Sequence, residues 1–166
     1  MPVTTSGSWR AAATITKAIG ALNASEELIV TASLALAAGT GINAADKAYY
    51  ARPTIAGSAT LSLDMAGALL DIYGDAFIIA RLKLLVVKSD LVLCPNVINV
   101  LRQAAGVPFL GASGDFVPVR PGGSLILYAP DATGYAVTAT TADLIDIVNT
   151  AAGNVQPELL IVGASV

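Results

Sequence analysis

The chain has 166 residues, and its charged fraction of 13 % is about half the usual share in a soluble domain. Its net charge is −3 and its nine basic residues are scattered, which excludes a groove that tracks nucleic-acid phosphates. Histidine is absent, so serine–histidine and cysteine–histidine nucleophile pairs and histidine metal ligands are excluded as well.

The scarcity of charge also bears on how the surface is covered. Apolar residues make up 55 % of the chain, and its length predicts one domain with a substantial core. A lone soluble domain needs more charge than this to avoid apolar patches. We therefore expect much of the surface to be buried against other subunits. A compact monomer whose surface is rich in alanine, serine and threonine is the alternative.

The N-terminal segment is typical of an extended arm. Residues 1–8 have neither the basic start nor the apolar run of a secretory signal. Their composition predicts a flexible arm over residues 1–9, followed by a single domain over residues 10–166. The longest stretch without charge, residues 28–45, is interrupted by polar residues and glycine, so we expect no membrane-spanning helix and a cytoplasmic origin.

Strands are predicted next along the chain. Apolar residues recur at every second position over residues 28–36, and again over residues 59–65. This period of two predicts antiparallel strands with one face on a core. A further strand is expected at Arg81–Lys88.

Three segments contain good helix formers among these strands. They are residues 69–88, residues 95–105 and residues 142–152. In the first of them, the helix would precede the strand at Arg81–Lys88. Because the surrounding sequence favours strands and tertiary context overrides local propensity, we expect only one or two short helices.

The C-terminal third predicts a hairpin and two final strands. Residues 124–128 and 135–139 flank a loop of proline, aspartate and glycine, which indicates a β-hairpin. The last two strands are predicted at residues 143–149 and 158–163. For residues 143–149, a strand and a helix are competing interpretations. Short strands at this spacing predict an all-β fold, either a sandwich or a barrel.

Few residues are candidates for chemistry. Cys94, the only cysteine, follows an apolar run and is expected to be buried and structural. Asp64, Asp71 and Asp75 lie close in the sequence with only Tyr73 beside them, so we interpret them as turn carboxylates rather than as a catalytic pair. We expect no catalytic residue, no cofactor and no metal site.

The aromatic residues are the candidates for subunit contacts, because buried aromatics dominate interface energetics. The candidate interface residues are Trp9, Tyr49, Tyr50, Phe109 and Phe116. Tyr49 and Tyr50 are consecutive, and on a strand they would point to opposite faces. Core filling is the alternative for each of the five.

Several segments together resemble small structural proteins of tailed bacteriophages. In chain order they are LALAAGTG (34–41) with ADK (45–47), RLKLLVVK (81–88), PGGSLIL (121–127), APDATGYAVT (129–138), DLIDIVN (143–149) and ELLIVG (158–163). The resemblance covers most of the chain from about residue 25 and is closest from residue 120 onward. Residues 90–106 depart from the family's pattern.

The resemblance implies a jelly-roll-like β-sandwich that serves in the virion and is not an enzyme. The role it favours is that of a decoration, or cement, protein on the capsid exterior. Such a protein would bind the major capsid protein lattice and its own copies as a homotrimer, with neither nucleic acid nor a membrane as partner. A tail or head-fibre component for host attachment is one alternative, and a jelly-roll ligand-binding module or enzyme is another. No catalytic residue carries over.

Overall fold

The computed structural model describes residues 3–19, 22–67 and 69–166 of the chain. Within them it has twelve strands and no helix, so the all-β class is confirmed and the expected short helices are absent. The described residues contain no helix suited to crossing a membrane. The strands are β1 (Thr5–Ile19), β2 (Leu22–Ala38), β3 (Ala44–Ala45), β4 (Lys47–Ala51), β5 (Thr60–Asp64), β6 (Arg81–Lys88), β7 (Ile98–Leu101), β8 (Phe116–Val119), β9 (Ser124–Tyr128), β10 (Tyr135–Ala136), β11 (Leu144–Asn149) and β12 (Glu158–Ala164).

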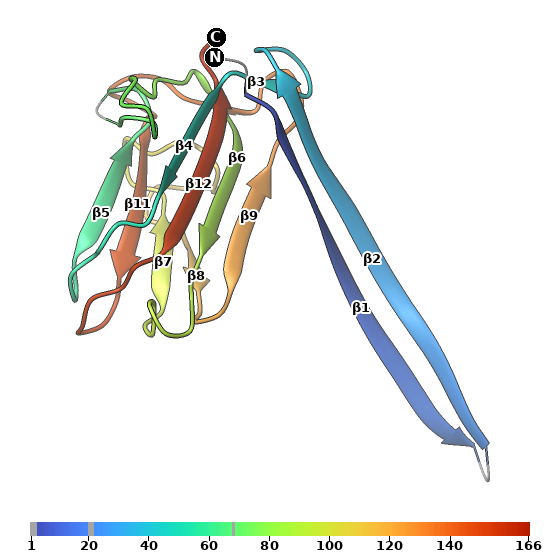
Figure 1. Ribbon diagram of the computed structural model, residues 1–166. Helices are drawn as coiled ribbons and strands as arrows, with labels where there is room; N and C mark the ends of the chain where they lie inside the picture. The colour runs from blue at the N-terminus through green and yellow to red at the C-terminus, as the bar shows by residue number, and fades with distance from the viewer. Residues whose placement is uncertain (1–2, 20–21, 68) are drawn as a thin grey trace.

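Strands β4 to β12 build a body of two facing sheets (Figure 1). The front sheet has the order β10–β6–β12–β4, and β9 also pairs with β6. The back sheet has the order β5–β11–β7–β8. Two antiparallel sheets that enclose one core form a β-sandwich.

The strand pairing is nested around the middle of the chain. β7 pairs with β8, β6 with β9, β5 with β11 and β4 with β12, all antiparallel. These four pairs lie alternately in the back and the front sheet. The body is therefore one long antiparallel ribbon rolled into two layers, and its first and last strands are neighbours.

The main core fills the space between the sheets. Leu63 and Met65, from the alternating stretch over residues 59–65, are buried in it, which confirms that prediction. Phe77 is fully buried, and its ring centroid lies 5.7 Å from that of Tyr49. Cys94 is buried in the same core, as expected.

β1 and β2 form a long hairpin that projects from the body (Figure 1). β2 has 17 residues, which at ~3.3 Å per residue corresponds to about 56 Å, roughly twice the span of the longest strand of the body. β3 adds a short parallel pairing at the root, where Ala37 lies beside Ala44. Residues 5–9, expected in the flexible arm, are part of β1 and pair with residues 32–36, whereas residues 1–2 lie outside the described structure.

The three segments with helical propensity adopt other structures. Residues 69–80 are irregular, residues 95–105 contain β7, and residues 142–152 contain β11. β11 lies between β5 and β7 and is hydrogen-bonded on both sides, while Ile145 and Ile147 are buried in the core. Sheet pairing and core burial thus outweigh local helical propensity.

The predicted hairpin between residues 124–128 and 135–139 is wrong. β9 and β10 do not pair with each other; both pair with β6, one after the other along the edge that β12 leaves free. The turn residues between β9 and β10 therefore form a loop between two strands that lie along the same edge of β6, and they do not connect two strands that pair with each other.

Asp131 stabilises this loop between β9 and β10. The Thr133 hydroxyl and the N–H groups of Gly134 (2.9 Å) and Thr133 (2.8 Å) donate to its carboxylate, which lowers the pKa of Asp131 to about 2. The ammonium of buried Lys83 donates to the Asp131 carbonyl, and burial lowers the pKa of Lys83. A buried cation on β6 thus fastens the loop that separates β9 from β10.

Candidate interaction surface

The projecting hairpin has an apolar face. Directly opposed residues of an antiparallel pair share a face, so the register assigns every second residue of β2 between residues 28 and 36 to it. The apolar face carries Leu28, Val30, Ala32, Leu34 and Leu36 of β2, and Ala13 and Ala11 of β1 lie opposite the first two. None of these positions holds a charged residue.

The opposite face of the hairpin is mostly polar. It carries Thr31 and Ser33 of β2 together with Arg10, whose guanidinium forms an ion pair with Glu27 at 2.7 Å. Both charged side chains are about half exposed. Such a surface pair contributes at most about 1 kcal/mol, so this face has the character of ordinary solvent-facing surface.

Burial of the apolar face falls steeply from root to tip. Leu36 is 3 % exposed and Leu34 is half-buried, but Val30 is 60 % exposed and Leu28 is 49 % exposed. The strand predicted over residues 28–36 is thus confirmed, whereas its expected contact with a core exists only at the root. The reason is that the hairpin diverges from the body as it extends (Figure 1).

The root of the hairpin packs on the outer face of the front sheet. Leu36 and Ala45 form a second buried cluster with Leu84 of β6 and Val162 of β12, separate from the main core. The front sheet is therefore apolar on both faces, one toward the main core and one toward the hairpin.

Hydrogen bonds fix the free edge of β2 at the same place. The Tyr128 hydroxyl of β9 donates to the Ala35 carbonyl at 3.0 Å and accepts the Ala35 N–H at 3.2 Å. The Ala37 N–H donates to the Asn43 carbonyl, and the Asn43 N–H donates to the Pro130 carbonyl, both at 2.7 Å. The hairpin is thus anchored to the body by backbone groups as well as by apolar packing.

Replacing Tyr128 with phenylalanine is expected to loosen this anchor. The variant keeps the ring but leaves both backbone groups of Ala35 without their partner, at a cost of about 1 kcal/mol. Amide hydrogen exchange at Ala35 should become several-fold faster. Tyr135→Phe is the control, because no hydrogen bond of its hydroxyl is found in the described structure; equal exchange at Ala35 in both variants would contradict the anchoring role.

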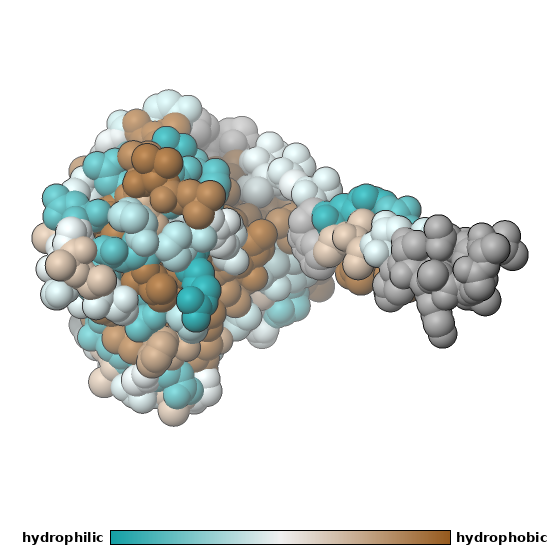
Figure 2. Space-filling model, turned by 90° about the horizontal axis from the view of Figure 1, so that it is seen from below, coloured by the Kyte–Doolittle hydropathy of each residue, from teal (hydrophilic) through white to brown (hydrophobic). Residues whose placement is uncertain are grey.

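Beyond the root, the outer face of the front sheet is partly uncovered. The register places Ile126, Val86, Leu160 and Tyr50 in one row across β9, β6, β12 and β4. Ile126 is 42 % exposed and Tyr50 is 44 % exposed. In Figure 2, apolar surface is visible where the hairpin meets the body. We call these four side chains the open row.

A groove of about 440 Å³ separates the hairpin from the end of the open row. Its hairpin wall comes from residues 32–34, and its other wall from Ser124, Ile126 and Tyr128 of β9. Ala32 and Leu34 on one wall and Ile126 on the other are apolar, and Ser33, Ser124 and Tyr128 add polar groups to the lining.

Paired charges border the open row beside Tyr50. One Glu158 oxygen accepts hydrogen bonds from Arg52 at 2.9 Å and from the Tyr50 hydroxyl at 2.8 Å, and the other accepts from Lys88 at 3.3 Å. Donation by Arg52, Tyr50 and Lys88 lowers the pKa of Glu158 to about 2. The carboxylate thus remains ionised at neutral pH and has its partners in place.

The two consecutive tyrosines lie on opposite faces of β4, as expected. Tyr49 packs against Phe77 in the main core, where burial raises its pKa, and Tyr50 points outward into the open row. Core filling, the alternative interpretation, therefore describes Tyr49, and surface exposure describes Tyr50.

The other three candidate interface residues lie elsewhere. Phe109 is buried in the main core, and Phe116 is 52 % exposed on β8, at the outer face of the back sheet. Trp9 lies on β1 opposite Ala32, and its side chain is outside the described structure. The structure thus does not gather the aromatic candidates into one surface.

Most residues on the outer face of the front sheet, where the root of the hairpin packs, were not predicted as contact residues from the sequence. The signal was present in β6, where residues 84–87 are uninterrupted apolar residues instead of an alternation, and in β12 over residues 159–162. A continuous apolar run is typical of a strand covered on both faces. The second cover of the front sheet could therefore have been expected, although not what supplies it.

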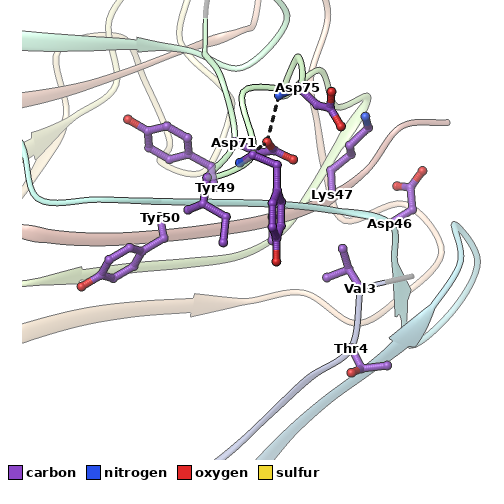
Figure 3. A pocket seen from close by; sticks show the side chains of 11 residues that line it. Val3, Thr4, Asp46, Lys47, Tyr49, Tyr50, Asp71 and Asp75 are labelled. Carbon is purple, nitrogen blue, oxygen red and sulfur yellow. Dashed lines mark hydrogen bonds between the residues drawn. The ribbon is translucent and has the colours of Figure 1, made fainter. Parts of the chain in front are cut away.

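A hollow of about 320 Å³ lies beside β4 and is lined by acidic and aromatic side chains (Figure 3). Asp71 accepts the N–H groups of Tyr73 at 2.8 Å and Asp75 at 3.0 Å, and Asp46 accepts the N–H of Ser165 at 2.8 Å. These bonds shape loops. Among the described residues, no three histidine, cysteine, aspartate or glutamate side chains form a group that could hold a metal ion.

Asp64 has the same kind of role as Asp71. Its carboxylate accepts the N–H of Ala66 at 2.9 Å, directly after β5. In both turns the aspartate carboxylate accepts the N–H of the residue two positions ahead, which is typical of turns that begin with aspartate. Asp64 and Asp71 thus hold their own turns, which is the role expected from the sequence.

Comparison with protein-family models, with curated protein sequences and with solved structures found no match to this chain.

Proposed function

We propose that the protein is a non-enzymatic capsid accessory protein of a tailed bacteriophage, which decorates the exterior of the virion and stabilises the major capsid protein lattice. Its partners are its own copies, as a homotrimer, and the capsid shell. The structure contributes an interaction surface to this proposal, and the virion setting comes from the resemblance of the sequence segments.

The observation that carries the proposal is the uncovered apolar face of the projecting hairpin. An isolated two-stranded hairpin is at best marginally stable in water. Here Val30 and Leu28 lie on the apolar face far from the body and are 60 % and 49 % exposed. A surface of this kind needs a cover that the single chain does not provide, and that requirement is typical of a subunit of a larger assembly.

The nested strand pairing supports a jelly-roll assignment for the body. A ribbon of four antiparallel strand pairs, rolled so that successive pairs alternate between two sheets, is the arrangement of the jelly roll, which recurs in viral capsid domains. Fold alone does not define function, so this agreement adds to the surface argument without replacing it.

The composition agrees with the same role. Contacts that are mainly apolar lose little strength as salt rises, whereas exposed ion pairs are screened. Repeated seating on a symmetrical shell would also multiply a modest affinity per contact. A protein with 13 % charged residues and an uncovered apolar hairpin is suited to this mode of binding.

Co-sedimentation with empty heads assembled from the cognate major capsid protein tests the proposal. The full chain should pellet with the heads at low and at high salt. A variant with Leu28→Asp and Val30→Asp should pellet at least ten-fold less, and a control with Thr31→Asp and Ser33→Asp on the polar face should pellet as the parent does. Failure of the parent chain to pellet, or its recovery with purified tails instead, would overturn the capsid role.

A further inference from the structure

We propose that the outer half of the hairpin's apolar face docks on the open row of the front sheet of a second copy of this chain. This deepens the proposed function by naming the partner of the hairpin, and it rests on that function only in treating the chain as an assembling subunit. The interface would join Leu28, Val30 and Ala32 of one copy to Ile126, Val86 and Leu160 of the next.

Half of this interface already exists within the chain. At the root, Leu34 and Leu36 of β2 lie against the outer face of the front sheet, with Leu84, Val162 and Ala45 around them. The contact is strand face against sheet face, and its core is fully buried. The chain therefore demonstrates that this face of its hairpin and this face of its sheet are complementary.

The remaining half of the hairpin face and the remaining half of the sheet face repeat the same chemistry. On the hairpin, Val30 and Leu28 continue the two-residue spacing of Leu36 and Leu34 toward the tip. On the sheet, Val86 lies two residues beyond Leu84 on β6. Both halves are continuous with the buried interface at the root. Val86 and Leu160 are half-buried against it, whereas Ile126 on the sheet and Val30 and Leu28 on the hairpin are exposed.

One chain cannot close these two halves on each other. The hairpin diverges from the front sheet (Figure 1), and the groove of about 440 Å³ between residues 32–34 and β9 marks where they part. Tyr128 bonds to Ala35 and thereby fixes the root. With its root fixed, the outer half of the hairpin stands away from its own sheet and is available to another copy.

The two surfaces that would meet in this contact carry no charged side chain. Over residues 28–36 of β2 the apolar face has no charged residue, and the open row consists of Ile126, Val86, Leu160 and Tyr50. The register assigns Glu26 and Lys17, nearer the tip, to the same face, so the proposed contact ends at Leu28. Glu158 beside the row is already paired with Arg52 and Lys88. Docking of a second copy would therefore bury no unpaired charge, which is the main cost that excludes an interface.

Because the hairpin and the open row are different surfaces, each copy would both give and receive a contact. Such contacts close either as a reciprocal pair around a two-fold axis or as a ring of three or more copies. The homotrimer of the proposed function is one of these closed forms.

Disulfide capture between two differently tagged single-cysteine variants tests the inference in the absence of any shell. One chain carries Val30→Cys and the other Ile126→Cys; native Cys94 is fully buried and does not compete. Mild oxidation of the mixture should give a mixed disulfide as the main cross-linked product. Thr31→Cys mixed with Ile126→Cys is the matched control and should give at least ten-fold less.

Light scattering of the uncross-linked protein completes the test. The parent chain and Thr31→Asp should have the mass of a dimer or a larger ring, and Val30→Asp should fall to the 16.7 kDa of one chain. A monomeric parent, or equal cross-linking from Val30→Cys and Thr31→Cys, would overturn the inference. The capsid role would then stand or fall separately, by co-sedimentation with heads.

Discussion

Replacing Phe77 with alanine is expected to lower the free energy of unfolding by about 3–5 kcal/mol. Phe77 is fully buried between the sheets, where its ring packs against Tyr49, and it anchors the irregular segment of residues 69–80 to the core. Truncation removes the apolar transfer energy of the ring and leaves a cavity that rigid strands cannot fill. Urea unfolding should show a lower midpoint with an unchanged slope.

The neighbouring residue provides the control for this variant. Ile78 follows Phe77 directly and is 46 % exposed, so Ile78→Ala should cost less than about 1 kcal/mol. If the two variants lost equal stability, Phe77 would not be an anchor of the core.

Replacing Asn149 with alanine is expected to cost about 3 kcal/mol. Asn149 is fully buried at the end of β11, and its amide donates to the carbonyls of Gly153 at 2.7 Å and Ala56 at 3.0 Å. Its side-chain oxygen accepts from the Asn96 amide at 3.2 Å. Alanine would remove these bonds and leave buried polar groups without partners, so three loops at one end of the body would loosen together.

Urea unfolding and limited proteolysis measure this effect. Proteolytic cleavage within residues 151–154 should become faster than in the parent chain. Asn154→Ala, an exposed asparagine in the same turn, should change stability by less than about 0.5 kcal/mol and leave cleavage unchanged. Similar behaviour of both variants would show that the buried amide network does not hold the loops.

Strand positions were largely predictable from the sequence because they depend on local apolar patterning. The strand expected at Arg81–Lys88 has these bounds in the structure, and the last two strands agree within one residue. The helical propensity of residues 142–152 competed with the strand prediction there, and it is overridden because propensity is measured without the neighbours that β11 finds in β5 and β7. Local sequence thus predicts the position of a strand, but it does not decide between strand and helix where both patterns are present.

Strand partners were not predictable by the same reasoning. Residues 124–128 and 135–139 have every local feature of a hairpin, yet β6 takes both as neighbours because its long apolar edge offers pairing to each. Likewise, alternation over residues 28–36 predicts a covered face without specifying whether the cover is a core, a sheet face or another copy. Pairing and cover depend on residues distant in the chain.

The candidate surface was predictable only in part. Low charge indicated that some surface must be covered, but the aromatic residues chosen as contacts are scattered between the core, the back sheet, β1 and β4. The face that the structure places beside the hairpin consists mainly of valine, leucine and isoleucine on β6, β9 and β12. These residue types are abundant throughout the chain, so composition does not distinguish them from core residues.

The nested pairing has a consequence for synthesis on the ribosome. β4 pairs with β12, which also lies beside β6, so two strands made early wait for residues 158–164 before their sheet closes. β1 and β2 are adjacent in the chain and can pair as soon as they emerge. Local pairs form quickly, whereas distant ones first require a long loop to close. A nascent chain would therefore have both strands of the projection before it has their anchor on the body, and only complete chains could present the sheet that receives the hairpin.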